Sequence, residues 1–177
     1  GHPGPTSKAD CLNAIHRAVR DREIPGRREY TIMALHDAED ILHPLTLKVY
    51  NHHVPSSLDM GQLPVFPLEA TPWRHWVRNT YLDEFAEWHV KDMFSREKIG
   101  GVVPSAGVGT AFSRRAIEHL ASRHGGDPFP PGNLAEDYMV ALELSRAGFR
   151  TGFLDHAVSR EAVKRDKTGR VRSTRKI

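Results

Sequence analysis

Cysteine is almost absent from this sequence, since Cys11 is the single example among 177 residues. One cysteine excludes an internal disulfide, which is typical of proteins that work in a reducing compartment. Cys11 lies beside Leu12 in a helical pattern, so we expect it to be a small residue of the core. Long hydrophobic runs are also lacking, and none approaches the roughly 20 residues that a membrane-spanning helix needs. The first five residues have neither the charged start nor the apolar stretch of a secretory signal.

Aromatic residues are sparse at 8%, and the net charge is only +3. With 39% hydrophobic and 27% charged residues, the composition is that of an ordinary globular protein, neither disordered nor fibrous. A chain of 177 residues fits one domain, given about 100 to 200 residues per domain. We therefore expect one domain over residues 1–160, followed by a segment of different character.

Positive charge is concentrated at the C-terminal end of the chain. Residues 157–177 hold eight Lys or Arg against Glu161 and Asp166, a local excess of +6. Because no aromatic residues are interleaved to stack bases, a solvated segment is favoured over a nucleic-acid or lipid contact. The turn-forming sequence Asp-Lys-Thr-Gly at residues 166–169 predicts a basic surface hairpin or tail over residues 161–177.

A crowded group of carboxylates follows a short apolar run. Residues 30–35 lack polar alternation, which predicts a strand buried on both faces of a mostly parallel sheet. Asp37 then emerges at the carboxyl end of this strand, where open α/β sheets bind their ligands. Asp37, Glu39 and Asp40 repel one another unless a metal ion or another cation offsets their charge. The alternative for Asp40 is structural, as the N-cap of a following helix.

Helical and extended patterns alternate along the rest of the chain, which indicates an α/β fold with helices flanking a sheet. We expect helices that begin at Ser7 or Thr6, near Pro44, near Trp73, at Ser113 and after residue 133, and extended segments over residues 62–68 and 149–154. Two prolines in residues 62–68 remove ladder donors and favour a sheet edge for that segment.

Apolar spacing indicates which faces of these helices are buried. In the first helix the stripe that we expect to face the core is Ala9, Leu12, Ile15 and Val19. In the last helix the residues expected on one side are Leu134, Tyr138, Leu142 and Ser145, and Gly148 ends it. Between them, the stripe Trp73, Val77, Tyr81, Phe85 and His89 is core in one interpretation and a ligand platform in the other.

Two polar segments are further candidates for a site. The loop that begins at Gly107 contains two glycines, which allow the backbone to approach a ligand closely but are also common in ordinary turns. Glu136 and Asp137 follow a Pro/Gly loop and lie in the first turn of a helix, where the helix dipole favours carboxylates. Functionally, such a carboxylate can accept the proton of a bound hydroxyl while its oxygen attacks.

Four motifs, in this order and spacing, are similar to those of a known family. They are Lys-Ala-Asp-Cys-Leu-Asn from Lys8, Asp-Ala-Glu-Asp-Ile-Leu-His-Pro from Asp37, Gly-Val-Gly-Thr-Ala-Phe-Ser-Arg-Arg from Gly107 and Ala-Glu-Asp from Ala135. Over about residues 5–160 the chain resembles the processive-type family 2 inverting glycosyltransferases. The resemblance implies the GT-A fold of nucleotide-diphospho-sugar transferases. Further motifs of that family are expected before Lys8 and beyond the C-terminus, so the domain looks truncated at both ends.

The resemblance also implies roles for individual residues. The catalytic base is Asp137, and the acceptor side is formed by Gly107, Gly109, Thr110 and Glu136. The nucleotide-sugar contacts are Lys8, Asn13 and Asp37, the first two in a positional role. Glu39 corresponds to the metal-binding acid but is one methylene longer than the aspartate of the family, and Asp40 is expected to share the metal.

The cofactor and partners that the resemblance implies are a divalent metal, Mg or Mn, a nucleotide-diphosphate sugar and a glycan or lipid-linked acceptor. No nucleic-acid partner is expected. The resemblance also implies a place on the cytoplasmic face of the bacterial inner membrane, within a larger protein whose membrane segments lie outside this chain. The alternative is a catalytically silent relative that acts as a scaffold or phage-receptor component. A zinc site at His36, His52 and His53 is disfavoured because no HExxH or comparable spacing occurs.

Overall fold

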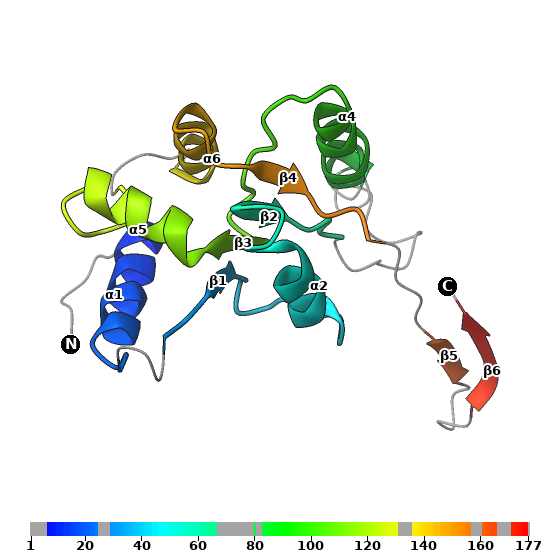
Figure 1. Cartoon of the computed structure of the whole chain (residues 1–177). Helices are drawn as coiled ribbons and strands as arrows, with labels where there is room; N and C mark the ends of the chain where they lie inside the picture. Colours follow the sequence, from blue (N-terminus) through cyan, green and yellow to red (C-terminus); the bar gives the residue numbers. More distant parts are fainter. Residues whose placement is uncertain are drawn as a thin grey trace.

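The computed structural model describes residues 7–24, 29–66, 80, 83–130 and 136–156, and the backbone of the strands at 161–165 and 171–176. At its centre lies a four-stranded sheet in the order β1-β3-β2-β4 (Figure 1). Its strands are β1 (Ile32–Leu35), β2 (Met60–Gln62), β3 (Thr110–Ser113) and β4 (Thr151–Phe153). Helices pack on both faces of this sheet, which confirms the α/β class.

The sheet is mixed, so the expectation of a mostly parallel sheet is wrong in this detail. Strand β3 runs antiparallel to both β1 and β2, and only β2 and β4 are parallel. β1 is an edge strand whose Ala34 is exposed, so it is not buried on both faces as predicted. A short apolar run does not by itself distinguish an edge strand of a mixed sheet from a central parallel strand.

β2 lies inside the sheet rather than at its edge. Its three residues are all buried between β3 and β4. The prediction of an edge position rested on prolines in residues 62–68, but the paired segment ends at Gln62, before Pro64. The prolines therefore leave the ladder donors of β2 intact.

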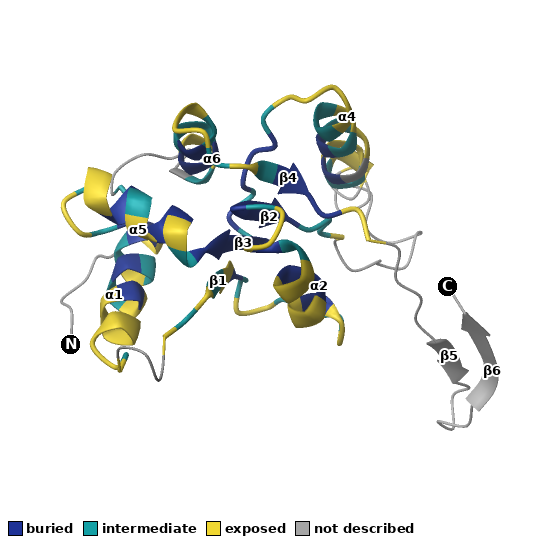
Figure 2. Ribbon diagram, in the orientation of Figure 1, coloured by how far each residue is buried: buried dark blue, intermediate teal, exposed yellow. Residues whose placement is uncertain are grey.

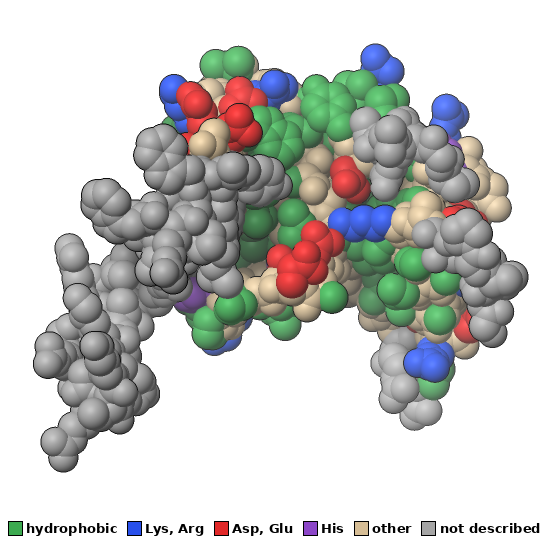
Figure 3. All heavy atoms as spheres, turned by 180° about the vertical axis from the view of Figure 1, so that it is seen from behind, with side chains coloured by type: hydrophobic (Ala, Val, Ile, Leu, Met, Phe, Trp, Pro, Cys, Tyr) green, Lys and Arg blue, Asp and Glu red, His purple; other side chains and the backbone are tan. Residues whose placement is uncertain are grey.

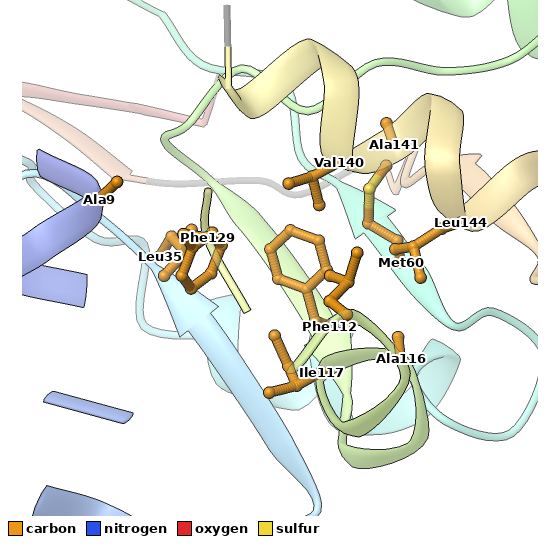
Figure 4. Packing of buried hydrophobic residues seen from close by; sticks show 11 residues of the cluster. Ala9, Leu35, Met60, Phe112, Ala116, Ile117, Phe129, Val140, Ala141 and Leu144 are labelled. Atoms are coloured by element: carbon orange, nitrogen blue, oxygen red, sulfur yellow. The ribbon is translucent and has the colours of Figure 1, made fainter. Parts of the chain in front are cut away.

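One face of the sheet is covered by α1 (Lys8–Arg20), α5 (Arg114–Arg123) and α6 (Glu136–Arg146). Ser7 caps α1 in a capping box with Asp10, as the sequence predicts for its start. Figure 4 shows side chains from these helices meeting those of the strands around Phe112 and Met60. The cluster consists of Ala9, Leu35, Met60, Phe112, Ala116, Ile117, Leu120, Phe129, Val140, Ala141 and Leu144.

The buried faces of α1 and α6 differ from those predicted. α1 buries Ala9, Asn13 and His16, whereas the side chains of Ile15, Val19 and Cys11 are exposed. α6 buries Val140, Ala141 and Leu144, whereas Tyr138 is exposed and Leu142 and Ser145 are half-buried. In both helices the buried stripe includes small or polar residues, so the spacing of large apolar residues does not identify it. The helix end at Gly148 is confirmed, with φ at 82°.

The other face of the sheet carries α2 (Thr46–His53), the π-helix η1 (Glu87–Asp92) and α4 (Met93–Lys98). Val49, Tyr50 and Val54 pack against Ala111 and Leu154. A separate cluster joins Met93 of α4 to Val103 and Phe153. Burial is concentrated along the strands and the sheet-facing sides of the helices (Figure 2). Of the expected aromatic stripe, Trp73, Val77 and Tyr81 lie outside the described residues.

At the C-terminal end of the chain, β5 (Glu161–Arg165) pairs antiparallel with β6 (Val171–Lys176). These strands form a sheet of their own. The division of the chain into residues 1–160 and 161–177 stays a prediction. No described helix is both long enough and apolar enough to cross a membrane.

Candidate functional site

The turn after β1 carries the three clustered carboxylates. Asp40 Oδ2 accepts the Asp37 N–H at 3.0 Å and lies 3.1 Å from His36 Nδ1. The backbone N–H of Asp40 in turn donates to Asp37 O at 3.1 Å. α2 begins only at Thr46, so the alternative role of Asp40 as a helix cap is wrong, because its carboxylate closes the turn instead. Glu39 is exposed.

Tyr50 of α2 contacts this turn through His36. Its hydroxyl lies 3.2 Å from His36 Nε2. Burial, together with the charge of Asp40, holds the pKa of Tyr50 well above its usual value, so the hydroxyl stays protonated. Because the Asp40 carboxylate can only accept, His36 Nδ1 is the donor in their contact, and in the neutral ring Nε2 then accepts from the Tyr50 hydroxyl. No sequence pattern indicates this hydrogen-bond network, because Tyr50 and His36 are 14 residues apart.

Lys8 connects the acidic turn to the glycine loop. From the first turn of α1, its Nζ donates to Asp37 Oδ1 at 2.9 Å and to Gly107 O at 2.9 Å. The side chains of Lys8 and Asp37 are each 40% exposed, so the pair lies at the surface and is open to a ligand. Lys8 thus supplies a cation to Asp37, one of the three clustered carboxylates.

Asp137 lies directly against the glycine loop. Gly107 has φ at +70°, and a Cβ built on it would lie 2.6 Å from Asp137 Cγ and overlap the carboxylate. Asp137 is half-buried in the first turn of α6, as the sequence predicts. The structure thus brings four predicted site residues together: Lys8, Asp37, Gly107 and Asp137. Figure 3 shows acidic and basic side chains meeting near the middle of one face of the molecule.

The remaining predicted residues lie around this group or away from it. Gly109 (φ +66°) donates its N–H to Leu35 O at 2.9 Å and so extends the β1–β3 ladder. Thr110 is fully buried at the start of β3 rather than exposed to an acceptor. Asn13 is buried and bonds the backbone of Phe129, with Nδ2 donating to its O at 2.7 Å. The backbone of Glu136 begins α6, and its side chain lies outside the described part of the structure.

Gln62, the last residue of β2, was not predicted from the sequence as part of the site. It is fully buried, and its amide bonds several backbone groups of the 105–110 loop. The only sequence signal is a polar residue at the end of a short apolar segment, which is common in strands that end at a surface loop. Nothing in the pattern indicates that this amide points inward.

The side chains of the turn after β1 provide few ligands for a metal ion. No described His, Cys, Asp or Glu side chains form a group of three or more that could hold a metal ion. Mg²⁺ at a nucleotide site is usually held by one or two carboxylates together with substrate phosphates. The exposed carboxylate of Glu39 fits an ion that arrives on a diphosphate, whereas Asp40 fits less well because its Oδ2 already accepts two hydrogen bonds.

Comparison with known proteins gives two findings. A family model described as glycosyl transferase family group 2 matches residues 32–175. Two relatives, Bacteriophage adsorption protein B of Escherichia coli (strain K12) and Bacteriophage N4 adsorption protein B of Escherichia coli O157:H7, are each 43% identical over 164 residues. That alignment covers 93% of this chain and 22% of each relative. The chain therefore spans less than a quarter of the length of the curated relatives that it matches.

Proposed function

This chain belongs to glycosyl transferase family group 2, and from that premise we propose that it is an inverting glycosyltransferase domain. It transfers a sugar from a nucleotide-diphosphate sugar to a hydroxyl of a glycan or lipid-linked acceptor in cell-surface glycan synthesis. Asp137 is the catalytic base. Lys8 and Asp37 hold the donor, and Gly107 and Gly109 together with Glu136 lie on the acceptor side.

One observation carries the proposal. Lys8, Asp37, Gly107 and Asp137 come from four separate parts of the chain and meet at one place, through two contacts of Lys8 Nζ at 2.9 Å and the close approach of Asp137 to Gly107. A base for a hydroxyl and a cation for an anionic leaving group are the two groups that this transfer needs. A purely structural ion pair between Lys8 and Asp37 does not require a second carboxylate, that of Asp137, packed against Gly107.

Proton removal is the task of Asp137. As the acceptor oxygen forms its bond to the anomeric carbon, the carboxylate takes the hydroxyl proton, and the bond to the diphosphate breaks on the opposite face of the sugar. The configuration is thereby inverted in a single displacement. Gly107 allows the backbone to lie against the carboxylate, which restricts where Asp137 is placed.

The donor side is built around Lys8. Its ammonium is shared by the Asp37 carboxylate and the neutral carbonyl of Gly107. A diphosphate entering beside Lys8 offers the ammonium stronger anionic partners, so the lysine stabilises the leaving group. A bound Mg²⁺ or Mn²⁺ would be held by Glu39, with Asp37 and Asp40 nearby in the same turn, and would supply Lewis-acid stabilisation of the diphosphate.

Replacing Asp137 by Asn in the full-length protein tests the proposal. We expect release of nucleoside diphosphate from nucleotide-diphosphate sugars to fall by about 10³-fold, because a general base contributes about 10²–10⁴. Titration with uridine diphosphate and Mn²⁺ should change little. The matched control is Glu143→Gln on the same helix, whose carboxylate bonds His124 at 2.9 Å, away from Gly107. Turnover by Asp137→Asn equal to that of the control would refute the assignment.

The names of the relatives suggest where this domain works. The Escherichia coli proteins are named for bacteriophage adsorption. We propose that this chain is likewise part of a larger protein at the cytoplasmic face of the inner membrane, held there by segments outside residues 1–177. In that setting its product is a surface glycan. Fractionation of cells that carry the full-length protein, with and without carbonate extraction, tests the membrane association.

A second candidate is a catalytically silent scaffold within a phage-receptor assembly. It is favoured by Glu39, which is one methylene longer than the aspartate expected there. Calorimetric titration with uridine diphosphate and Mn²⁺ separates the two functions. Metal-dependent binding that is lost in Asp37→Ala supports the enzyme, whereas no binding by the full-length protein supports the scaffold.

A further inference from the structure

We propose that Gln62 is a positioning residue for the transfer. Its side-chain amide holds the 105–110 loop, which contains Gly107, and so sets where Asp137 and Lys8 lie. The inference rests on the proposed function for its catalytic consequence. Its structural part, the anchoring of the loop, stands on hydrogen bonds alone and can be tested separately.

The amide of Gln62 uses both of its ends on this loop. Its Nε2 donates to Val108 O at 2.9 Å and to Leu63 O at 2.8 Å, with Gly109 O at 3.3 Å. Its Oε1 accepts the Ala106 N–H at 2.9 Å. One buried side chain therefore bonds backbone groups on both sides of Gly107.

Two hydroxyl groups complete the anchor. Thr110 Oγ1 donates to Gln62 Oε1 at 2.6 Å and lies 3.0 Å from Ser105 Oγ. Ser105 Oγ in turn accepts the Gly107 N–H at 3.2 Å. The N–H of Gly107 is thus directed inward, and its carbonyl is directed to Lys8 Nζ at 2.9 Å. The peptide groups around Gly107 are therefore oriented by the buried side chains of Gln62, Thr110 and Ser105.

Only an amide satisfies this site. Gln62 is fully buried, and the groups around it include carbonyl oxygens that need a donor and an N–H and a hydroxyl that need an acceptor. A carboxylate would place a second oxygen against the carbonyls, and an apolar side chain would remove the hydrogen bonds to Val108 O and from the Ala106 N–H. The loop would then shift toward other partners, and a shift of about 1 Å is enough to cost roughly 10²-fold in rate.

The consequence reaches two site residues at once. Asp137 lies against Gly107, and Lys8 is bonded to its carbonyl, so both depend on the position of this one residue. Gln62 touches neither of them. It acts through the loop, which is why its loss is expected to lower turnover more than donor affinity.

The test compares Gln62→Met with Met60→Leu in the full-length protein. Met60 lies two residues earlier in β2, is also fully buried and points to the same side of the sheet, but packs only in the apolar cluster. Hydrogen exchange of the peptide over residues 103–113 is measured first. We expect exchange at least about tenfold faster in Gln62→Met and near the wild-type rate in Met60→Leu.

Steady-state kinetics are measured on the same variants through release of nucleoside diphosphate from a panel of nucleotide-diphosphate sugars. We expect kcat to fall by at least about tenfold in Gln62→Met, with KM for the donor within about threefold of wild type. Loop exchange equal to that of Met60→Leu, or faster exchange with unchanged kcat, would overturn the inference. A wild type that turns over no donor would overturn the proposed function, while the exchange result still decides whether Gln62 anchors the loop.

Two further variants keep the test decisive if Gln62→Met fails to fold. Gln62→Glu retains the acceptor oxygen and removes the donor, and Thr110→Val removes one hydroxyl of the anchor. Both should raise exchange over residues 103–113 and lower kcat in the same direction, with the smaller change in Thr110→Val. Wild-type exchange and wild-type kcat in both would overturn the inference.

Discussion

At the scale of single residues, Gly107 is the most constrained position of the site. Its φ of +70° belongs to the left-handed region, and a Cβ there would overlap the Asp137 carboxylate. We predict that Gly107→Ala lowers the free energy of unfolding by about 1–3 kcal/mol, from backbone strain and steric overlap. Turnover should fall by about 10²-fold or more, because Asp137 must move away from its position. Urea unfolding and steady-state kinetics measure the two effects.

Gly125 provides the matched control for that substitution. It has the same φ of +70°, but nothing lies within 4 Å of a Cβ built on it. Gly125→Ala therefore reports the strain of the left-handed backbone alone, about 1–2 kcal/mol. If both variants lose activity equally, or if Gly107→Ala keeps normal turnover, the contact with Asp137 has no part in the reaction.

The three carboxylates of the turn show what can and cannot be predicted from residue types alone. Their crowding predicts a nearby metal ion or another cation, and the structure places Lys8 against Asp37 alone of the three. Their separate tasks were beyond prediction from the sequence. Lys8 is 29 residues away along the chain, and the partner of Asp40 is set by Tyr50 and His36, which only the packing of α2 on the sheet brings together.

At the scale of elements, the π-helix η1 buries a histidine without a hydrogen-bond partner. His89 is fully buried, both ring nitrogens are unpaired, and its ring stacks on Phe85 at 4.4 Å between centroids. Burial lowers the pKa of His89 to about 4. The folded protein thus favours the neutral ring, and stability is complete above pH 6.5 and falls as the pH drops from there toward 4.

This histidine predicts a pH dependence of stability. Between pH 7 and pH 5, protonation of His89 in the unfolded chain should lower the free energy of unfolding by about 2 kcal/mol. The variant His89→Phe keeps a ring of similar size and should lose that share of the pH dependence. At pH 7 it should be as stable as wild type or more so, because no hydrogen bond is removed. The exposed His52→Phe serves as control in urea unfolding at both pH values.

An equal loss of stability at pH 5 in wild type and in His89→Phe would show that the ring is not held neutral in the fold. His16 is likewise buried with unpaired nitrogens and a lowered pKa, caused first by burial and then by Arg20. It remains in both proteins, so the comparison isolates His89.

The elements themselves were largely predictable, but their buried faces were not. The helices of α1, α2, α5 and α6 and the strands β1 and β4 lie where caps, glycines and apolar runs place them. The faces differ because tertiary contacts select small or polar side chains, such as Asn13 and His16 on α1, over Ile15. Strand direction was equally hidden, since it depends on how the long connection between β2 and β3 returns to the sheet.

At the scale of the whole molecule, the candidate site contains residues from two helices that are far apart in the sequence. Lys8 belongs to the first helix, whereas Asp137 belongs to the last helix before β4. The buried Asn13 holds α1 against the segment that follows α5, because its amide forms two hydrogen bonds with the backbone of Phe129.

This link separates two roles for Asn13. If it is structural, Asn13→Ala leaves the N–H and C=O of Phe129 buried and unpaired, and the free energy of unfolding should fall by about 3 kcal/mol. The exposed Asn51→Ala on α2 should change stability by less than about 0.5 kcal/mol. Both are measured by urea unfolding, with titration of uridine diphosphate and Mn²⁺ at equal folded fraction. Unchanged stability together with weakened nucleotide binding would instead mean that Asn13 reaches the nucleotide directly, and that its bonds to Phe129 give way when the donor enters.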